Sequence, residues 1–320
     1  MNLLNFAVLL SAAVVAWPIS AAAQQRQKVT RIGVLSTAWN LSSPFLQGFR
    51  ARLEELGYVE GQNLALEVRS GEGRNERLPT FAAELVGLHV DVIVTAGPYA
   101  LEAAKAATAT IPIVFAGVGA NLASTRDGGN LTGVAEEITE STVKRLALLK
   151  EAVPSLTRIA VLANPNNYGT PAYLHQCHAW AHAAGVTLQV YDVRDPNDIA
   201  PAFAKMISER AEGLIAFTDS IIFGQRETIV QTALKNGLPG AYPYREWVVA
   251  GGLLSYGPNL ATILRETVPV MIDKILKGAK PSDLPVEQPK SEIFVNLKTA
   301  QVLSITIPPS LLARADEMIE

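Results

Sequence analysis

Cysteine and charge are both scarce in this sequence. Cys177 is the single cysteine among 320 residues, which excludes a disulfide framework and a four-cysteine zinc site. Charged residues make up 18% of the chain and hydrophobic residues 49%, a balance that excludes a disordered protein. The formal net charge of −3 argues against a basic face, so we expect no nucleic-acid partner. The sequence therefore predicts a globular protein of about two domains.

The beginning of the chain lacks charged side chains until Arg26. Residues 6–17 form an apolar run that is shorter than the roughly 20 residues needed to span a bilayer. Three alanines at 21–23 follow it, as at the cleavage site of a secretory signal peptide. We predict a signal peptide over residues 1–23, cleavage after Ala23 and a periplasmic protein. An uncleaved membrane anchor is the alternative.

Short apolar runs alternate with amphipathic patterns along the rest of the chain. Apolar strands separated by helices are typical of parallel sheets that are covered on both faces. Strands are predicted over 30–36, 64–69, 91–96, 112–116, 131–135, 157–163, 186–191, 213–218, 239–242, 253–256 and 292–296. Helices are predicted over 44–56, 76–88, 98–108, 140–152, 171–184, 197–210, 224–236 and 259–277. Eleven strands are too many for one open sheet, so we expect an α/β protein with two doubly wound parallel-sheet lobes.

A short internal repeat indicates that the chain has two similar halves. The segment TRIGVLS at 30–36 resembles TRIAVLA at 157–163, an offset of 127 residues, and Pro112 and Pro239 precede strands at the same offset. A chance match between two βαβ units is the alternative, but two matches at one offset favour duplication. The chain continues after the second half, and we expect it to cross between lobes near 136–142, 250–252 and 285–290.

Motifs of catalysis and of cofactor binding were not found. The turn after the first predicted strand has no glycines to admit a pyrophosphate, and the chain has no Walker A lysine and no nucleophile elbow. His175, His178 and His182 have the spacing of one helix face beside Cys177, which would suit zinc or copper. A helix face that carries histidines without a metal is the favoured interpretation. We therefore predict no catalytic residue, no cofactor and no metal site.

Aromatic residues make up only 7% of the chain, yet several follow predicted strands. Ligands of parallel α/β sheets bind beyond the carboxyl ends of the strands, where helices begin. Helix N-termini suit a ligand carboxylate, Asp219 or Glu246 would receive an ammonium, and aromatic rings would hold a planar group. The predicted ligand-binding residues are Ser36, Trp39, Thr95, Gly97, Pro98, Phe115, Asn164, Asp219, Tyr244 and Glu246. The structural alternatives are a core position for Trp39 and Phe115, and a helix cap for Asp219.

Several longer motifs resemble one known family. They include SPFLQGFR at 43–50, EELGYVEGQN at 54–63, AGGLLSYGP at 250–258, LKGAKPSDLPVEQP at 276–289 and IPPSLL at 307–312. With these motifs the chain resembles the substrate-binding proteins of ABC transporters of the tryptophan/tyrosine-binding type. The resemblance covers nearly all of the predicted mature chain. Residues 119–127 depart from it, because this connection is shorter and lacks the Asp-Pro that relatives carry.

The resemblance implies a type I periplasmic-binding fold, in which a three-segment hinge joins two lobes. The expected N-terminal lobe comprises residues 28–138 and 252–285, and the expected C-terminal lobe comprises 139–251 and 286–320. The family's ligand contacts carry over to this chain at Ser36, Thr95, Gly97, Pro98, Asn164, Asp219 and the segment 244–246.

The function implied is that of a periplasmic solute-binding component of an ABC importer. It would bind a small organic ligand, such as an amino acid or an aromatic or carboxylate compound, and deliver it to a permease and ATPase complex. We expect a monomer without enzymatic activity. The alternative is a periplasmic sensor or receptor subunit that signals through a membrane partner.

Overall fold

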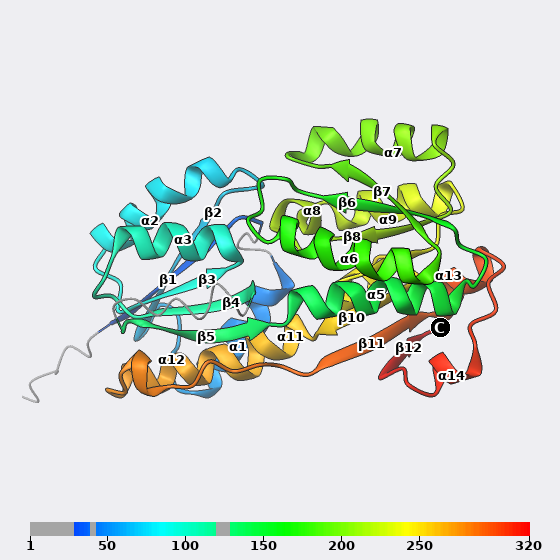
Figure 1. Ribbon diagram of the computed structural model, residues 1–320. Helices are drawn as coiled ribbons and strands as arrows, with labels where there is room; N and C mark the ends of the chain where they lie inside the picture. The colour runs from blue at the N-terminus through cyan, green and yellow to red at the C-terminus, as the bar shows by residue number, and fades with distance from the viewer. Residues whose placement is uncertain (1–28, 39–42, 120–128) are drawn as a thin grey trace, which may run out of the picture.

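The computed structural model describes residues 29–38, 43–119 and 129–320 (Figure 1). The predicted signal peptide and Trp39 lie outside these ranges. The described chain forms two α/β lobes side by side, as the sequence predicted, each built on a mainly parallel sheet. No helix in the described ranges combines the length and the apolar character needed to cross a bilayer.

The first lobe contains a five-stranded parallel sheet of order β2-β1-β3-β4-β5. Alternate side chains of its central strands enter two different cores, because side chains along a strand point to opposite faces. Val34 and Val94 pack beneath α1, whereas Leu35, Ile93 and Phe115 pack beneath α2 and α3. The elements of this half are β1 (Thr30–Ser36), α1 (Pro44–Glu55), β2 (Leu64–Ser70), η1 (Asn75–Arg77), α2 (Leu78–Gly87), β3 (Val92–Ala96), α3 (Pro98–Ala107), β4 (Ile113–Gly119) and β5 (Leu131–Glu136).

The second lobe contains a seven-stranded sheet of order β12-β11-β10-β9-β8-β6-β7. Five strands are parallel, while β11 runs antiparallel to β10 and pairs with β12 at the edge. The elements of this lobe are α5 (Ile138–Ala152), β6 (Arg158–Ala163), α6 (Thr170–Ala184), β7 (Thr187–Asp192), η2 (Pro196–Asp198), α7 (Ile199–Ser208), β8 (Gly213–Ala216), α8 (Ser220–Gly224), α9 (Arg226–Lys235), β9 (Gly240–Tyr242), α10 (Arg245–Val249), β10 (Leu254–Pro258), β11 (Ser291–Asn296), α13 (Leu297–Val302), α14 (Pro309–Leu312) and β12 (Glu317–Ile319).

The two halves repeat the same strand order, which agrees with the internal repeat in the sequence. The order β2-β1-β3-β4-β5 of the first sheet recurs as β7-β6-β8-β9-β10 in the second. In both halves, a carboxylate at the amino end of the sheet forms a hydrogen bond to the backbone at the start of a neighbouring strand. The Asp91 side chain accepts a hydrogen bond from the Arg31 backbone N–H at 2.8 Å. Glu212 occupies the matching position before β8.

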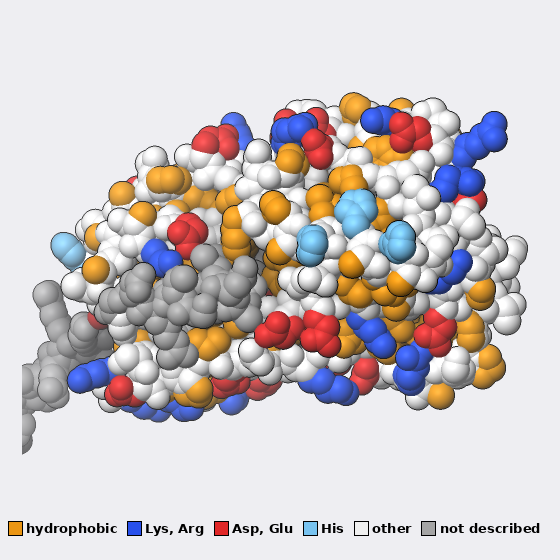
Figure 2. Space-filling view, in the orientation of Figure 1, with side chains coloured by type: hydrophobic (Ala, Val, Ile, Leu, Met, Phe, Trp, Pro, Cys, Tyr) orange, Lys and Arg blue, Asp and Glu red, His pale blue; other side chains and the backbone are white. Residues whose placement is uncertain are grey.

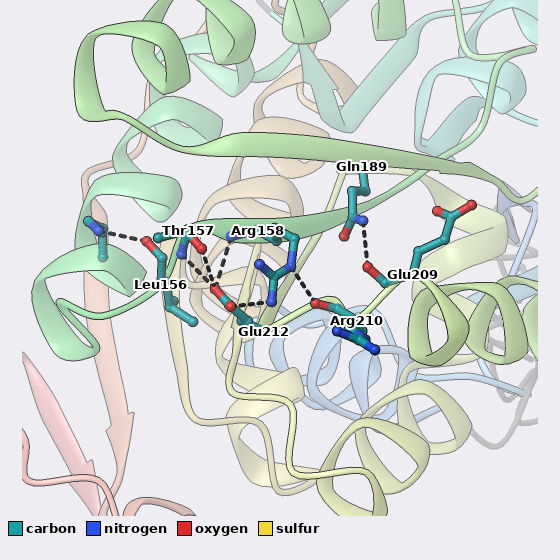
Figure 3. Close-up of polar contacts among 8 residues, drawn as sticks. Leu156, Thr157, Arg158, Gln189, Glu209, Arg210 and Glu212 are labelled. Atoms are coloured by element: carbon teal, nitrogen blue, oxygen red, sulfur yellow. Dashed lines mark hydrogen bonds and ion pairs between the residues drawn. The ribbon is translucent and has the colours of Figure 1, made fainter.

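Glu212 and the groups that donate hydrogen bonds to it form what we call the Glu212 clamp (Figure 3). Glu212 Oε2 accepts hydrogen bonds from the Thr157 N–H at 2.7 Å and the Arg158 N–H at 3.1 Å, and its other oxygen accepts one from the Arg158 guanidinium. Hydrogen bonds from the backbone of Thr157 contribute most to holding the pKa of Glu212 below its ordinary value. This clamp fixes the start of β6 against the start of β8.

The chain crosses between the lobes three times, and one crossing differs from the prediction. The first lies at the junction of β5 and α5, and the third follows Glu287, which forms a β-bridge with Val134 of the first sheet. The second crossing was predicted near 250–252. It lies instead after β10, because this strand pairs with β9 and β11 of the second sheet.

Residues 254–258 therefore belong to the second sheet, not to the first lobe as expected. The chain then returns to the first lobe through α11 (Leu260–Thr262), a π-helical turn over Ile263–Thr267 and α12 (Val268–Leu276), followed by η4 (Pro281–Asp283). Met271 and Ile272 of α12 complete the core beneath the first sheet. The remaining lobe boundaries stay predictions.

Helix α6 carries the three histidines that had the spacing of a metal site. His175, His178 and His182 are exposed, and Figure 2 shows three histidine side chains close together on the surface over this helix. Cys177 points the other way and is buried. Within the described residues, no group of three or more His, Cys, Asp or Glu side chains is placed to hold a metal ion.

The Glu212 clamp gives a test of how the second sheet is held. In Glu212→Ala, two backbone N–H groups at the start of β6 lose their carboxylate acceptor, and we expect the free energy of unfolding to fall by about 1 kcal/mol. Urea denaturation followed by circular dichroism measures this change. Glu227→Ala is the control, since Glu227 is exposed and forms an ion pair only with the neighbouring Arg226 among the described residues. Equal effects of the two substitutions would contradict a role for the clamp.

Candidate functional site

A cavity lies where the carboxyl ends of strands from both sheets meet. The arrows of β4 and β5 point toward the second lobe, so the carboxyl ends of the parallel strands of the first sheet face that lobe (Figure 1). The cavity, together with its open mouth, holds about 620 Å³ of empty space. It is lined by Ser36, Ala38, Ala96, Gly97, Pro98, Ala116, Gly117, Gly119, Ile138, Asn167, Tyr168, Tyr173, Thr218, Asp219, Ser220, Phe223, Tyr244 and Leu260.

One wall of the cavity is aromatic and comes from the second lobe. Phe223 and Tyr244 pack edge to face, with ring centroids 5.7 Å apart. Tyr173 makes a similar contact with the buried Phe217 at 5.8 Å. Tyr168 stands at the mouth and keeps 44% of its surface exposed. Rings held in this way offer flat apolar faces and edges to a planar ligand group.

Asp219 is buried in the cavity wall and is surrounded by neutral hydrogen-bond donors. Its Oδ1 caps α8 by accepting from the backbone N–H groups of Ile221 at 2.9 Å and Ile222 at 3.3 Å. Its Oδ2 accepts from the side-chain amides of Asn167 at 3.1 Å and Asn164 at 3.3 Å. Burial raises the pKa of Asp219, and these hydrogen bonds oppose that rise. Asp219 is thus a helix cap, the structural alternative considered for it.

Tyr99 joins the Asp219 cluster from the first lobe. It lies in the first turn of α3, and its hydroxyl donates to Asp219 Oδ2 at 3.5 Å while it accepts from Asn164 Nδ2 at 3.3 Å. Burial raises the pKa of Tyr99 far above its ordinary range, so this hydroxyl stays protonated and remains a donor. The two lobes are therefore hydrogen-bonded to each other at the edge of the cavity.

A second buried carboxylate, Glu136, ends β5 at the first crossing. The Tyr244 hydroxyl donates to its Oε2 at 3.0 Å. Burial raises the pKa of Glu136 to about 7. The buried Arg145 of α5 lies nearby and donates to Thr142 Oγ1 at 2.6 Å and to Thr218 Oγ1 at 3.4 Å. Burial lowers the pKa of Arg145 to about 10, which leaves it charged at neutral pH.

The structure brings together only part of the predicted set of site residues. Ser36, Gly97, Pro98, Asp219 and Tyr244 line the cavity, and Asn164 lies behind its wall in the Asp219 cluster.

Three other predicted residues lie elsewhere. Thr95 and Phe115 are buried within the first sheet, with Phe115 in the core beneath α2 and α3. Glu246 lines a separate groove beside Arg226 and Arg265. These positions do not reach the cavity, and ligand contact by these three residues stays a prediction.

The prediction omitted Glu136, Arg145, Tyr99, Asn167 and Tyr173. Tyr99 and Asn167 follow strand ends directly, so the same argument covered them. Glu136 carried one further indication, which is a charged residue at the end of an apolar strand. Arg145 and Tyr173 lie inside helices, and the sequence offered no feature to separate them from surface or core residues.

A two-lobed α/β fold with a cavity at the junction of the lobes is typical of a class of binding proteins. A family model described as ABC transporter substrate binding protein matches residues 42–319. The chain therefore belongs to the family of ABC transporter substrate-binding proteins. It is the solute-binding component of such a transporter and not an enzyme.

Similar proteins agree with this assignment. A tyrosine-binding protein of Clostridioides difficile (strain R20291) is 22% identical over 266 residues, which cover 81% of this chain and 76% of that protein. An ABC domain from Streptococcus pneumonia, solved in complex with L-Trp, has a TM-score of 0.80 and 26% identity, covering 91% of this chain and 99% of that one. A conserved domain protein from Vibrio cholerae also has a TM-score of 0.80, at 25% identity, covering 91% of this chain and 100% of that one.

The buried Glu136 leads to a prediction about pH. Between its ordinary pKa of 4.5 and about 7, the folded protein holds a proton on Glu136 that the unfolded chain has lost. The stability of the ligand-free protein should therefore fall as pH rises through this window, by up to about 3 kcal/mol relative to Glu136→Gln. Urea denaturation of both proteins at pH 5 and pH 8 measures the difference. Glu137→Gln, at the exposed neighbouring residue, should follow the wild-type protein. Parallel pH curves for wild type and Glu136→Gln would contradict the prediction.

Proposed function

We propose that this protein binds an amino acid with an aromatic side chain, or a related aromatic carboxylate, between its two lobes. The observation that carries the proposal is the aromatic wall of a cavity to which both lobes contribute. The L-Trp complex and the tyrosine-binding relative support the same class of ligand. In this proposal the ligand's ring packs against Phe223, Tyr173 and Tyr168.

Another part of the cavity suits a carboxylate. Gly97 and Pro98 lie where α3 begins, and the N-terminus of a ten-residue helix attracts negative charge. The hydroxyls of Ser36 and Ser220 line the cavity with them. Gly97 has a φ of +84°, and a Cβ atom there would lie 2.6 Å from Ser220 Oγ. Glycine thus allows the lobes to approach closely beside the carboxylate position.

Binding would shift the protein toward the closed arrangement. Contacts across the junction include the Tyr99 cluster and the rings of Phe45 and Phe223, whose centroids lie 6.2 Å apart. A ligand that touches both lobes adds contacts that only the closed form can make, so it increases the closed population. The three crossings would act as the hinge.

The closed form would then deliver its ligand to the permease and ATPase complex of an importer. In this proposal the chain is exported by the signal peptide over residues 1–23 and works as a monomer in the periplasm, without a nucleic-acid partner. The family assignment supports a role in ABC transport. A sensor subunit would differ in one respect, because deletion of the gene would abolish a signalling response and leave uptake intact.

A thermal-shift screen tests the ligand class. A ligand present at 100 times its Kd should stabilise the mature protein by about 2.7 kcal/mol, because it binds the folded state alone. We expect tryptophan, tyrosine or phenylalanine to raise the melting temperature. Glycine, alanine and glutamate are controls that lack an aromatic ring. Stabilisation by the controls alone, or by no compound in a screen of amino acids and aromatic acids, would contradict the proposal.

Tyr99→Phe tests the contact between the lobes. This substitution keeps the ring but removes the hydroxyl that reaches Asp219 and Asn164 from the first lobe. We expect ligand affinity to fall about threefold to tenfold, since the two hydrogen bonds of this hydroxyl to the second lobe are lost from the closed form. Isothermal titration calorimetry measures the affinity, and small-angle X-ray scattering follows closure. Tyr256→Phe is the matched control, because Tyr256 lies on β10 outside the cavity. An unchanged affinity in Tyr99→Phe would show that this contact does not favour closure.

A further inference from the structure

The two buried carboxylates at the lobe junction differ in how completely their hydrogen-bonding capacity is used. Asp219 accepts from five neutral donors, namely two backbone N–H groups, two side-chain amides and one hydroxyl. An ionised carboxylate offers about four acceptor sites, so Asp219 has no room for a donor from a ligand. Among the described residues, Glu136 accepts from the Tyr244 hydroxyl alone. Glu136 therefore keeps acceptor sites free.

Glu136 also lacks a direct counter-charge. The buried cation nearest to it in this network, Arg145, is committed to the Ser141 carbonyl and to the hydroxyls of Thr142 and Thr218. Arg145 acts on Glu136 through its charge at longer range. A buried carboxylate with one hydrogen bond and no ion pair is costly, and a cation that arrives with the ligand would remove much of that cost.

The position of Glu136 places it next to the cavity. In the first sheet it pairs with Gly119, which lines the cavity. A Cβ atom at Gly117, another lining residue, would lie 3.9 Å from Glu136 Oε1. Tyr244 lines the cavity and also donates a hydrogen bond to Glu136. Three residues that line the cavity, Gly117, Gly119 and Tyr244, therefore lie beside Glu136.

We propose that Glu136, oriented by the Tyr244 hydroxyl, receives the ammonium group of the ligand, whereas Asp219 serves as the helix cap and the contact between lobes. The inference rests on the proposed function and deepens it. It selects an aromatic ligand that carries an amine, such as an α-amino acid, over an aromatic acid without one.

A consequence for pH follows from the groups that face Glu136. These are Tyr244 after β9, Tyr173 on α6 and Arg145 on α5, and all three keep their charge state near neutral pH. An ammonium beside Glu136 favours its ionised form, so the proton that Glu136 holds in the free protein leaves on binding. Affinity for the amino acid should therefore rise with pH up to about 7 and become constant above it.

The experiment compares amino acids with analogues that lack the amine. Calorimetry on the mature protein uses L-tryptophan with 3-(indol-3-yl)propanoate, and L-tyrosine with 3-(4-hydroxyphenyl)propanoate. We expect the wild type to prefer the amino acid, and Glu136→Gln to lose about 10-fold to 100-fold of that preference, as for one hydrogen bond to a charged group. Glu137→Gln removes the same charge one residue along, outside the cavity, and should keep the preference.

The outcomes separate this assignment from the function on which it rests. Binding with no preference for the amine, or a preference that Glu136→Gln retains, overturns the role of Glu136 and leaves the proposed function intact. Binding of none of the four compounds overturns the proposed function. If Glu136→Gln does not fold, wild-type titrations at pH 7 in phosphate and in Tris decide the matter. A fraction of a proton released on binding supports the assignment, and no release overturns it.

Discussion

The site depends on one constraint, which is that both sheets direct the carboxyl ends of their parallel strands into the same space. Residues at the ends of β1 and β3 and along β4 meet residues that follow β6, β8 and β9, so neither lobe forms the cavity alone. The three crossings keep the sheets in this orientation, and Glu136 ends the strand that leads into the first of them. A binding group thus lies next to a connection about which the lobes would move.

The two buried carboxylates at the junction differ in how many hydrogen bonds replace their contacts with water. Burial raises the pKa of both carboxylates, but five donors replace the water that Asp219 has lost, whereas Glu136 has one donor. This contrast separates a structural carboxylate from one with capacity for a ligand. Arg145 adds positive charge at a distance. Its hydrogen bonds to Ser141, Thr142 and Thr218 hold it outside the cavity lining.

The fold was largely predictable because its strands and helices appear as periodic hydrophobic patterns in the sequence. Apolar strands and amphipathic helices identified the α/β class, and the repeated TRI segments indicated two similar halves. β10 was assigned to the wrong lobe because strand pairing is a long-range property, and the sequence of Leu254–Pro258 does not name its partners. The site was less predictable for the same reason. Ser36 at the end of β1 and Gly97 and Pro98 after β3 reach the cavity, but Phe115 faces the core because side chains alternate along β4. Arg145 joins the junction only through the packing of α5.

Asp91 and Glu212 close the amino ends of the two sheets, far from the cavity along each strand. The carboxylates that join neighbouring strands and the residues that line the cavity therefore lie at opposite ends of the two sheets. Selection can exchange side chains at the cavity end while the amino end preserves the scaffold. The same separation makes this protein a suitable framework for designed biosensors, in which the cavity is rebuilt for a new molecule and the lobes report its arrival.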